Sequence, residues 1–340
     1  MPDNRLIECV PNFSEGSDPA VIRAITDAVG GIPGVQLLHT DIGKTANRMV
    51  VTFAGPPDAV AEAAFRAIRK ACELIDMSRH QGVHPRIGAV DVCPLIPISG
   101  ISMEETAGYA RALARRVGEE LQVPVYLYGK AALMALRTEL SDIRRGQYEG
   151  LAEKLKAPEW LPDFGPAVFH AKAGAVVIGA RDFLVAYNVN LDTADLKIAR
   201  AIAADIREKA PAVLSGRAAE EKNARRLPAV KAIGWYMEEY GIAQVSMNLT
   251  DARQTPVHTA FEACVRRAAD YGVRVSGSEL VGMIPLRYLT EAGRFFLEKK
   301  GAAGTADEEV LVRTAVKALG LDDLRAFDPR QKVIEYVMQR

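Results

Sequence analysis

The sequence predicts an α+β fold, an α/β sandwich of two tandem ferredoxin-like subdomains followed by a helical C-terminal extension. Two observations lead to this prediction. A chain of 340 residues is long enough for about two domains that each bury a core. The predicted order strand, helix, strand, strand, helix, strand occurs twice, and it is typical of the ferredoxin-like arrangement. The expected subdomains are residues 1–178 and 179–300, and the extension covers residues 301–340.

The first copy of this order begins with the strand LIECVPNF, which Pro11 interrupts, and apolar residues at helical spacing follow over 19–30. GVQLLHT and RMVVTFAG flank the turn-like segment DIGKTAN and predict a hairpin. A helix over 57–75 with one apolar stripe and the strand IGAVDVCPLIPI complete the copy. A further helix begins at Met103, behind a capping box of Ser102 and Glu105, and VPVYLYG adds one more strand.

The second copy lies beyond residues 155–175, where prolines and glycines interrupt any periodicity and predict a functional loop and a domain junction. Its predicted strands and helices follow the same order as in the first copy. They are a strand over 181–191, a helix over 194–210, strands over 229–237 and 243–250, a helix over 256–272 and a strand over 273–282. The last 40 residues, which include TADEEVLVRTAVKALG, predict helices.

Composition and charge exclude several classes of protein. Hydrophobic residues make up 49% of the chain and charged residues 25%, as in ordinary globular proteins. The 43 Lys and Arg balance 43 Asp and Glu, so neither nucleic acid nor an anionic membrane is an expected partner. The start of the chain is charged and no apolar run reaches about 18 residues, so we expect neither a signal peptide nor a membrane span, and a cytoplasmic location.

Short cofactor motifs give no support for a nucleotide or a metal. LHTDIGKT ends like a phosphate-binding loop, but Leu38 stands where the earlier glycine is required, and an extended run follows Thr45. We therefore interpret it as a hairpin turn. No GxGxxG occurs, and the four cysteines form no CxxC pair, so we expect free thiols.

The segment RHQGVHPRIGAVDV is the most informative stretch of the chain. It holds two imidazoles, an arginine and an aspartate between a packed helix and a packed strand, where catalytic groups commonly lie. His80 and His84 have the spacing of helical metal ligands, but Gly82 and Pro85 argue against a helix there. Two interpretations stay open: a catalytic imidazole, or a surface loop whose histidines form local hydrogen bonds.

Other polar residues have simpler explanations. His39 and His258 are predicted to be structural. Asn12, Ser14 and Glu15 follow a strand and could cap the next helix, although this density of polar groups at a strand end also suits ligand binding.

Longer motifs resemble the formiminotransferase family. The matching segments are ECVPNFSEG at Glu8 to Gly16, NRMVVTFAG at Asn47 to Gly55, IDMSRHQGVHPRIGAVDVCP at Ile75 to Pro94, PVYLYG at Pro124 to Gly129, PDFGP at Pro162 to Pro166 and KAIGWYMEEYGIAQVSMNLTD at Lys231 to Asp251. The resemblance covers nearly the whole chain. It implies two related α/β subdomains, a homodimer, and transfer of a formimino group between tetrahydrofolate N5 and the amino group of glutamate in histidine degradation. The additional cyclodeaminase domain of some animal relatives is not expected here.

The resemblance also implies individual site residues. The catalytic histidine of the family matches His84, and its supporting aspartate matches Asp41, in the expected hairpin turn. The folate-contacting loop of the family matches Gly165, Pro166, Ala167, Val168, Phe169, His170, Ala171, Lys172, Ala173 and Gly174. Tetrahydrofolate is therefore the expected co-substrate, with no metal and no nucleotide.

The chemistry of the implied reaction suits these residues. Transfer needs one group that accepts and then donates a proton, which imidazole does near neutral pH, and Asp41 would accept a hydrogen bond from the other ring nitrogen of His84. Arg48 and Arg86 are candidates for the glutamate carboxylates, with Asn12 as a further substrate contact; structural pairing is the alternative for each arginine. Formyl transfer from 5-formyltetrahydrofolate to glutamate and a non-catalytic folate sensor are the alternative functions.

Overall fold

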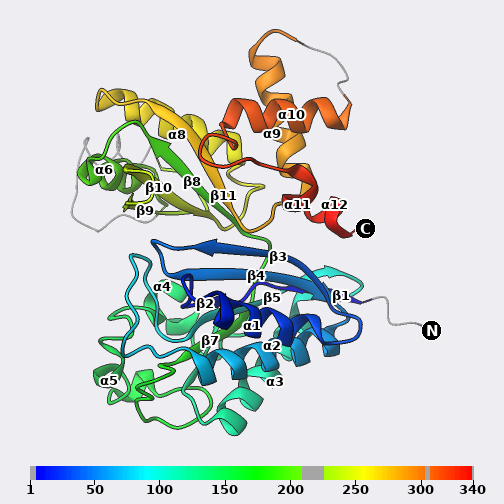
Figure 1. Cartoon of the computed structure of the whole chain (residues 1–340), viewed down its shortest axis with the longest axis vertical. Helices are drawn as coiled ribbons and strands as arrows, with labels where there is room; N and C mark the ends of the chain where they lie inside the picture. Colours follow the sequence, from blue (N-terminus) through cyan, green and yellow to red (C-terminus); the bar gives the residue numbers. More distant parts are fainter. Residues whose placement is uncertain (1–4, 209–225, 303–306, 339–340) are drawn as a thin grey trace. The chain divides into compact units, whose positions relative to one another are not determined.

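The chain forms two compact units in the computed structural model, Met1–Asp182 and Phe183–Arg340 (Figure 1). The structure describes residues 5–208, 226–302 and 307–338. Each unit has its own β-sheet and its own apolar core. Helices and strands are mixed within each unit, and helices end the second, so the predicted α+β class is confirmed.

The first unit begins with the predicted order of strands and helices. These elements are β1 (Leu6–Cys9), β2 (Asn12–Phe13), α1 (Pro19–Gly30), β3 (Gln36–Gly43), β4 (Arg48–Gly55), α2 (Pro57–Leu74) and β5 (Val90–Ser99). β1 and β2 both pair with β4 and β5, so they are two parts of one strand that Pro11 interrupts. The resulting order, β3-β4-β1/β2-β5, is antiparallel throughout, as in a ferredoxin-like sheet.

Three further elements extend this sheet: α3 (Met103–Leu121), β6 (Val125–Gly129) and β7 (Val176–Ala180). β7 lies between β5 and β6 and pairs with both in parallel. No strand is predicted from the sequence at β7, because a short strand buried on both faces shows no alternation of apolar and polar residues. Residues 155–175, where a domain junction is expected, therefore lie inside the first unit, which ends at Asp182.

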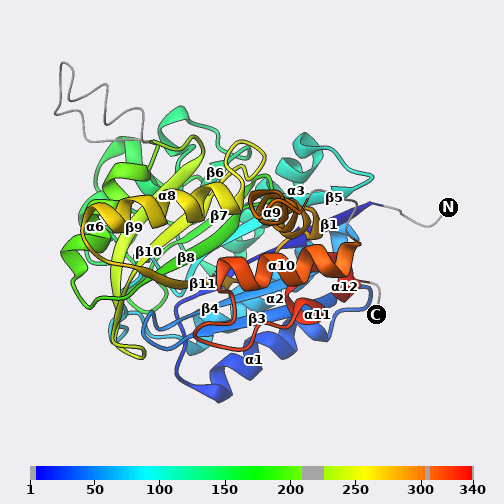
Figure 2. The same ribbon diagram turned by 90° about the horizontal axis from the view of Figure 1, so that it is seen from above.

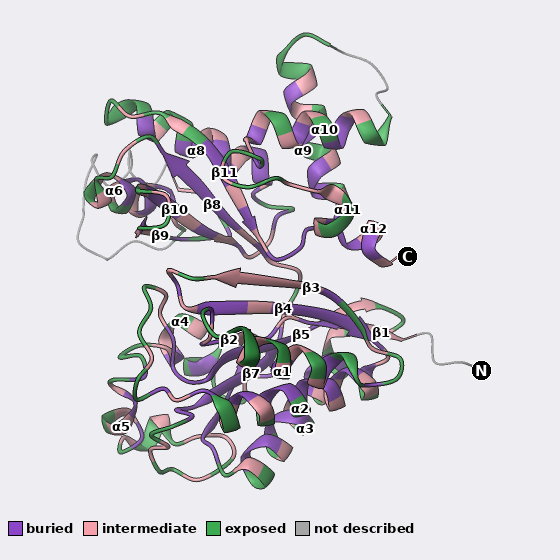
Figure 3. Ribbon diagram, in the orientation of Figure 1, coloured by how far each residue is buried: buried purple, intermediate pink, exposed green. Residues whose placement is uncertain are grey.

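Helices cover one face of the first sheet and leave part of the other face for polar side chains. α1, α2 and α3 pack on the first face and share its core. On the opposite face, a second apolar cluster joins β6 and β7 to the short helices α4 (Leu140–Ile143) and α5 (Leu151–Lys154). The 3-10 helices η1 (Ala135–Arg137) and η2 (Pro158–Trp160) flank these two helices in the chain. Figure 3 shows that the edge strand β3 is less buried than β4.

The second unit repeats the order of the first. Its elements are β8 (Val185–Leu191), α6 (Leu196–Ile206), β9 (Val230–Met237), β10 (Ile242–Leu249), α8 (Val257–Asp270) and β11 (Val275–Val281). The sheet order β11-β8-β10-β9 is antiparallel and corresponds strand by strand to β5-β1/β2-β4-β3. α6 and α8 lie side by side over one face of this sheet (Figure 2).

Helices complete the second unit, as predicted for the end of the chain. They are α9 (Leu286–Lys299), α10 (Glu308–Leu319), α11 (Pro329–Lys332) and α12 (Ile334–Met338). α10 packs closely on α9 at Gly293, where an added Cβ would lie 2.0 Å from the carbonyl oxygen of Leu311. Only glycine permits this approach, which brings apolar residues of both helices into the core of the unit.

Candidate active site

Asn12, Arg48 and Asp91 meet on neighbouring strands of the first sheet, on the face opposite α1, α2 and α3. Arg48 joins the other two: Nε and Nη2 donate to Oδ1 of Asn12 at 3.2 and 2.9 Å, and Nη1 lies 2.6 Å from Oδ2 of Asp91. Arg48 and Asp91 are only 8% and 0% exposed. The two predicted substrate contacts, Asn12 and Arg48, are therefore members of one buried network.

A second arginine, Arg144 at the end of α4, completes the network. Its Nε donates to Oδ1 of Asp91 at 3.0 Å, and its Nη2 contacts the other oxygen of that carboxylate. Neither Asp91 nor Arg144 is assigned a role from the sequence. One signal was available for Asp91, because a carboxylate inside an apolar strand must be paired when it is buried. Arg144 gives no such signal, because the sequence does not distinguish it from its neighbour Arg145. In the structure Arg144 binds Asp91, whereas Arg145 is exposed.

The electrostatics of the network keep the Asp91 carboxylate and the Arg48 guanidinium ionised. Burial by itself raises the pKa of Asp91, but Arg144 and Arg48 more than offset it and lower that pKa to about 2. Burial lowers the pKa of Arg48 to about 10, against the attraction of Asp91. Two cations around one carboxylate leave a net positive charge at this place in the sheet.

His84 lies in the loop between α2 and β5, close enough to this network for its charges to act on the ring. Its Nδ1 is 2.7 Å from the carbonyl oxygen of Pro85. A carbonyl only accepts, so Nδ1 carries the hydrogen, and the lone pair of the neutral ring is on Nε2. Burial lowers the pKa of His84 well below 6.5, and Arg48 and Arg144 lower it further, while Asp91 opposes them. At pH 7 the ring is therefore a neutral imidazole whose basic nitrogen is Nε2.

Asp41 lies in a strand and not in the hairpin turn, which corrects the prediction from the sequence. Because the pairing of β3 with β4 continues through these polar residues, β3 extends to Gly43, and residues 44–47 form the turn. Asp41 is opposite Val50 of β4, and its Oδ2 lies 3.5 Å from Nε2 of His39. A hydrogen bond between Asp41 and His84 stays a prediction.

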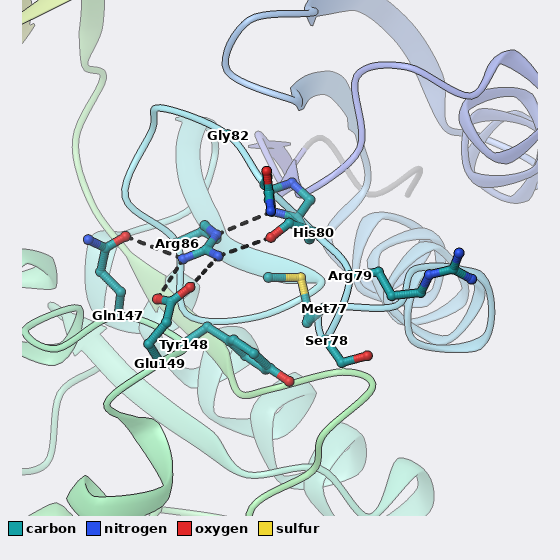
Figure 4. A pocket seen from close by; sticks show the side chains of 10 residues that line it. Met77, Ser78, Arg79, His80, Gly82, Arg86, Gln147, Tyr148 and Glu149 are labelled. Carbon is teal, nitrogen blue, oxygen red and sulfur yellow. Dashed lines mark hydrogen bonds and ion pairs between the residues drawn. The ribbon is translucent and has the colours of Figure 1, made fainter.

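Arg86 lies in the wall of a cavity of about 560 Å³, two residues beyond His84 (Figure 4). The cavity is lined by residues 77–82, Arg86 and residues 147–149. The guanidinium of Arg86 donates from Nε to Nδ1 of His80 at 3.2 Å, and its two terminal nitrogens bind the carboxylate of Glu149 at 2.8 and 2.6 Å. The second predicted substrate arginine is therefore in a cavity, with a carboxylate of the chain itself bound to it.

His80 is fixed by two hydrogen bonds that assign it a different role from His84. Its Nε2 is 2.9 Å from the carbonyl oxygen of Asn47, so Nε2 carries the hydrogen and Nδ1 accepts from Arg86. Burial lowers the pKa of His80 below 6.5, and the charge of Arg86 adds to this effect. His80 is therefore a neutral ring that orients the Arg86 guanidinium.

The loop that matches the folate-contacting segment lies against the chain that follows His84. Gly174 pairs with Gly88 in an isolated bridge, and the N–H of Ala89 donates to the carbonyl of Ala173 at 2.8 Å. Gly174 has a φ of +68°, and an added Cβ would lie 2.4 Å from a backbone oxygen, so this contact requires glycine. The end of the loop is therefore fixed against Gly88, which is four residues beyond His84 in the chain.

Several side chains of this loop are already used within the chain. Nδ1 of His170 accepts the N–H of Ala173 at 3.0 Å, and Nζ of Lys172 donates to a backbone carbonyl at the end of α2. Phe169 packs against Tyr148, with ring centroids 5.4 Å apart. Val168 is 66% exposed. What the loop offers a flat ligand is therefore its backbone and the apolar surface around Val168.

Other predictions concern cysteines and cofactors. All four cysteines are free thiols, as predicted. Lys44 and Thr45 of the GKT segment lie in the turn between β3 and β4, so the predicted hairpin is confirmed, while Gly43 is the last residue of β3. Within residues 5–208, 226–302 and 307–338, no group of three or more His, Cys, Asp or Glu could hold a metal ion. Over the same ranges, no helix combines the length and apolar character needed to cross a membrane.

The fold and the site define a two-unit α+β protein whose first unit carries a neutral imidazole beside two arginines that share a carboxylate. The N-terminal subdomain of the formiminotransferase domain matches residues 6–181, and the formiminotransferase domain matches residues 186–339. The chain therefore belongs to the formiminotransferase family, which confirms the resemblance found in the motifs.

Named relatives support this assignment. Formimidoyltransferase-cyclodeaminase of Mus musculus is 48% identical over 335 residues, which are 98% of this chain and 60% of that protein. Glutamate formimidoyltransferase of Thermoplasma acidophilum is 43% identical, with 87% of this chain and 93% of that protein covered. The enzyme of the same name from Streptococcus pyogenes serotype M1 is 40% identical, with 86% and 94% covered. The chain thus spans about 60% of the length of the first relative and matches most of the other two.

The similarity of the chain to solved structures is too weak to assign a fold or a function. The periplasmic protease PqqL from Escherichia coli, for example, matches with 11% identity and a TM-score of 0.19, covering 100% of this chain and 41% of that one.

Proposed function

We propose that the chain is a glutamate formimidoyltransferase. The reaction moves the formimino group between N-formimidoyl-L-glutamate and tetrahydrofolate, giving 5-formimidoyltetrahydrofolate and L-glutamate. Two relatives that the chain nearly spans carry this name. The observation that carries the proposal is the state of His84, a neutral ring with Nε2 as its basic nitrogen beside a positively charged network.

His84 would accept one proton and return it within each transfer. N5 of tetrahydrofolate attacks the formimino carbon and becomes positively charged, and Nε2 of His84 removes the N5 proton. The bond from the formimino carbon to the glutamate nitrogen then breaks while the imidazolium protonates that nitrogen. A lowered pKa makes the imidazolium a stronger acid, which serves this second step. The proton balance closes, and no metal or redox partner enters the scheme.

Asp41 has a role in this scheme that depends on the protonation of His84. Nδ1 of His84 already donates to the carbonyl oxygen of Pro85. A carboxylate can therefore bind the ring at Nε2 only when that nitrogen carries a proton. Because Nε2 also exchanges the proton with the substrate, we assign Asp41 to stabilising the imidazolium by its negative charge, and not through the Nδ1 hydrogen bond that a triad carboxylate makes.

The two candidate arginines divide into a structural and a substrate-binding role. Arg48 uses all three of its nitrogens on Asn12 and Asp91, so we assign it to setting the potential around His84. Arg86 faces a cavity and presents two parallel N–H donors, the geometry that binds carboxylates. A carboxylate of the glutamate moiety would bind there.

Tetrahydrofolate would bind along residues 165–174. The support is the family match and the contact of this loop with the backbone just beyond His84. An exposed apolar side chain and backbone donors and acceptors suit a flat ring with polar edges. The proposal includes a homodimer acting in the cytoplasm on small molecules, in histidine degradation and one-carbon metabolism, in line with the family.

A transfer assay tests the proposal directly. Purified protein is mixed with N-formimidoyl-L-glutamate and tetrahydrofolate, and equal amounts of L-glutamate and 5-formimidoyltetrahydrofolate are expected. A parallel reaction with 5-formyltetrahydrofolate and L-glutamate measures the formyl alternative. Tight folate binding with neither reaction would instead establish a sensor.

A further inference from the structure

Glu149 binds Arg86 in the way that a free carboxylate would. One carboxylate oxygen lies 2.8 Å from Nη1 and the other lies 2.6 Å from Nη2, so each terminal nitrogen has its own oxygen. This two-point geometry is the usual one between guanidinium and carboxylate groups. Figure 4 shows the pair beside the other residues that line the cavity. The side chain of Glu149 therefore takes up the donors that a carboxylate ligand in this cavity would use.

The two partners differ in how firmly they are held. The side chain of Arg86 is 9% exposed, and His80 fixes it through two further contacts, Nε to Nδ1 at 3.2 Å and Nη2 to the backbone oxygen at 3.3 Å. The side chain of Glu149 is 62% exposed. An exposed partner of an ion pair contributes little and can rotate into water at low cost. The cation is thus preorganised, while its carboxylate partner is replaceable.

The backbone around Glu149 can stay in place when its side chain moves. The N–H of Tyr148 donates to the carbonyl of Arg86 at 3.0 Å, and the Tyr148 ring packs on Phe169. Both contacts involve the residue before Glu149 and neither uses the Glu149 carboxylate. Displacement of that carboxylate therefore needs only side-chain rotation.

We propose that Glu149 is an internal competitor of the substrate. Its carboxylate occupies the Arg86 subsite until a carboxylate of the glutamate moiety displaces it. The inference rests on the proposed function and deepens it, because it names the carboxylate subsite and a residue that sets its selectivity. A ligand that offers a second two-point carboxylate replaces Glu149, and a neutral amide at the same position does not. Competition of this kind multiplies the intrinsic affinity for the substrate by the fraction of molecules in which Glu149 leaves the subsite free.

The test removes the charge of Glu149 and measures binding separately from chemistry. Glu149→Gln keeps the size of the side chain but removes its charge. The expected result is that the Kd for L-glutamate in calorimetry and the KM for N-formimidoyl-L-glutamate both fall about 2- to 5-fold, the effect of losing an exposed ion pair, while kcat changes less. The Kd values for L-glutamine, which lacks the side-chain carboxylate, and for L-isoglutamine, which lacks the α-carboxylate, are measured alongside. A smaller fall is expected for the ligand that lacks the carboxylate bound by Arg86.

Glu153→Gln is the matched control. Glu153 is also an exposed acid, 78% exposed and paired with Lys156, four residues from Glu149 and outside the cavity. Glu153→Gln undergoes the same change of charge but lies outside the cavity. The Kd of this variant for L-glutamate should therefore stay at the wild-type value. An equal fall in both variants would show a general charge effect and overturn the proposal.

The remaining outcomes separate this inference from the proposed function. Unchanged or weaker glutamate binding in Glu149→Gln would mean that Glu149 holds Arg86 in place, and the inference would be wrong while transfer by the wild-type protein could stand. If the wild-type protein transfers no formimino group, the proposed function fails, and the calorimetric Kd values still decide whether Glu149 competes. Arg86→Ala should raise the Kd for L-glutamate at least about tenfold. A smaller effect would show that Arg86 does not bind a carboxylate of glutamate.

Discussion

The two units share one sheet topology but differ in the chemistry of corresponding strands. In each, a β-α-β-β-α-β order gives an antiparallel sheet with the first strand between the third and the fourth. The first unit places Asn12 on its first strand, Arg48 on its third and Asp91 on its fourth. Arg144 and His84 complete that group from loops. The same strands of the second unit also meet in a polar network, but it is built differently.

The network of the second unit is made mainly of amides. Gln244, on the third strand, donates to Oδ1 of Asn190 at 2.7 Å, and Asn188 donates to Oε2 of Glu279 at 3.2 Å. Trp235 donates to Oε1 of Gln244 at 2.8 Å. A neutral glutamine therefore stands on the strand where the first unit has an arginine.

This difference teaches that the topology sets where polar side chains meet, while their identity sets what they can do. An arginine on the third strand requires a carboxylate partner when buried, and its charge adds to the effect of burial in lowering the pKa of the neighbouring His84. A glutamine is satisfied by neutral partners, here Asn190 and Trp235, and adds no charge. Four of the five histidines of the chain also lie in the first unit. Catalytic chemistry is expected in the first unit for these reasons.

The largest expected effect is on turnover, from His84→Ala. Loss of the group that accepts and returns the proton should lower kcat by about 10² to 10⁴ with the fold intact. His258 of the second unit provides the control, since its ring stacks on Phe295 and His258→Phe keeps an aromatic ring there. That variant should retain wild-type kcat. Full activity of His84→Ala would refute the assignment of the base, and circular dichroism checks the fold.

Next in size is a difference in stability between the two networks. Asp91→Asn leaves the buried guanidinium of Arg48 and the partly buried one of Arg144 without their carboxylate, so the free energy of unfolding should fall by about 3 to 5 kcal/mol. Glu279→Gln removes a carboxylate that accepts from neutral amides, and a loss of about 1 kcal/mol is expected. Urea unfolding followed by circular dichroism measures both. Equal losses would contradict the distinction between a network of paired charges and one made mainly of amides.

The smallest effect is a shift of the pH dependence. Burial, Arg48 and Arg144 lower the pKa of His84, so the wild-type kcat/KM should decline on the acid side only below pH 6.5. Arg144→Gln removes one cation and leaves Asp91 less neutralised, and both changes raise the pKa of His84 toward 6.5. The acid-side decline should therefore move to higher pH. A profile that does not move, or moves to lower pH, would show that Arg144 does not act on the titrating group.

The secondary structure could be predicted from the sequence where the pattern is local. The apolar stripe of α2, the capping box before α3 and the hairpin of β3 and β4 depend on residues that are close in the chain. β7 could not be predicted, because a five-residue apolar run becomes a strand only between β5 and β6. For the same reason the sequence predicts a turn that begins at Asp41, whereas strand pairing extends β3 to Gly43.

The sequence by itself determined the fold class, the family and the histidine that is our candidate base, because motifs and periodicity are read along the chain. Only the tertiary structure decided which charges surround that histidine. Arg144 and Asp91 are 53 residues apart, and Glu149 and Arg86 are 63 residues apart. Charges act through space, and burial strengthens their effect on a neighbouring pKa. The nitrogen that carries the lone pair, and the carboxylate that occupies the Arg86 subsite, therefore follow from the fold.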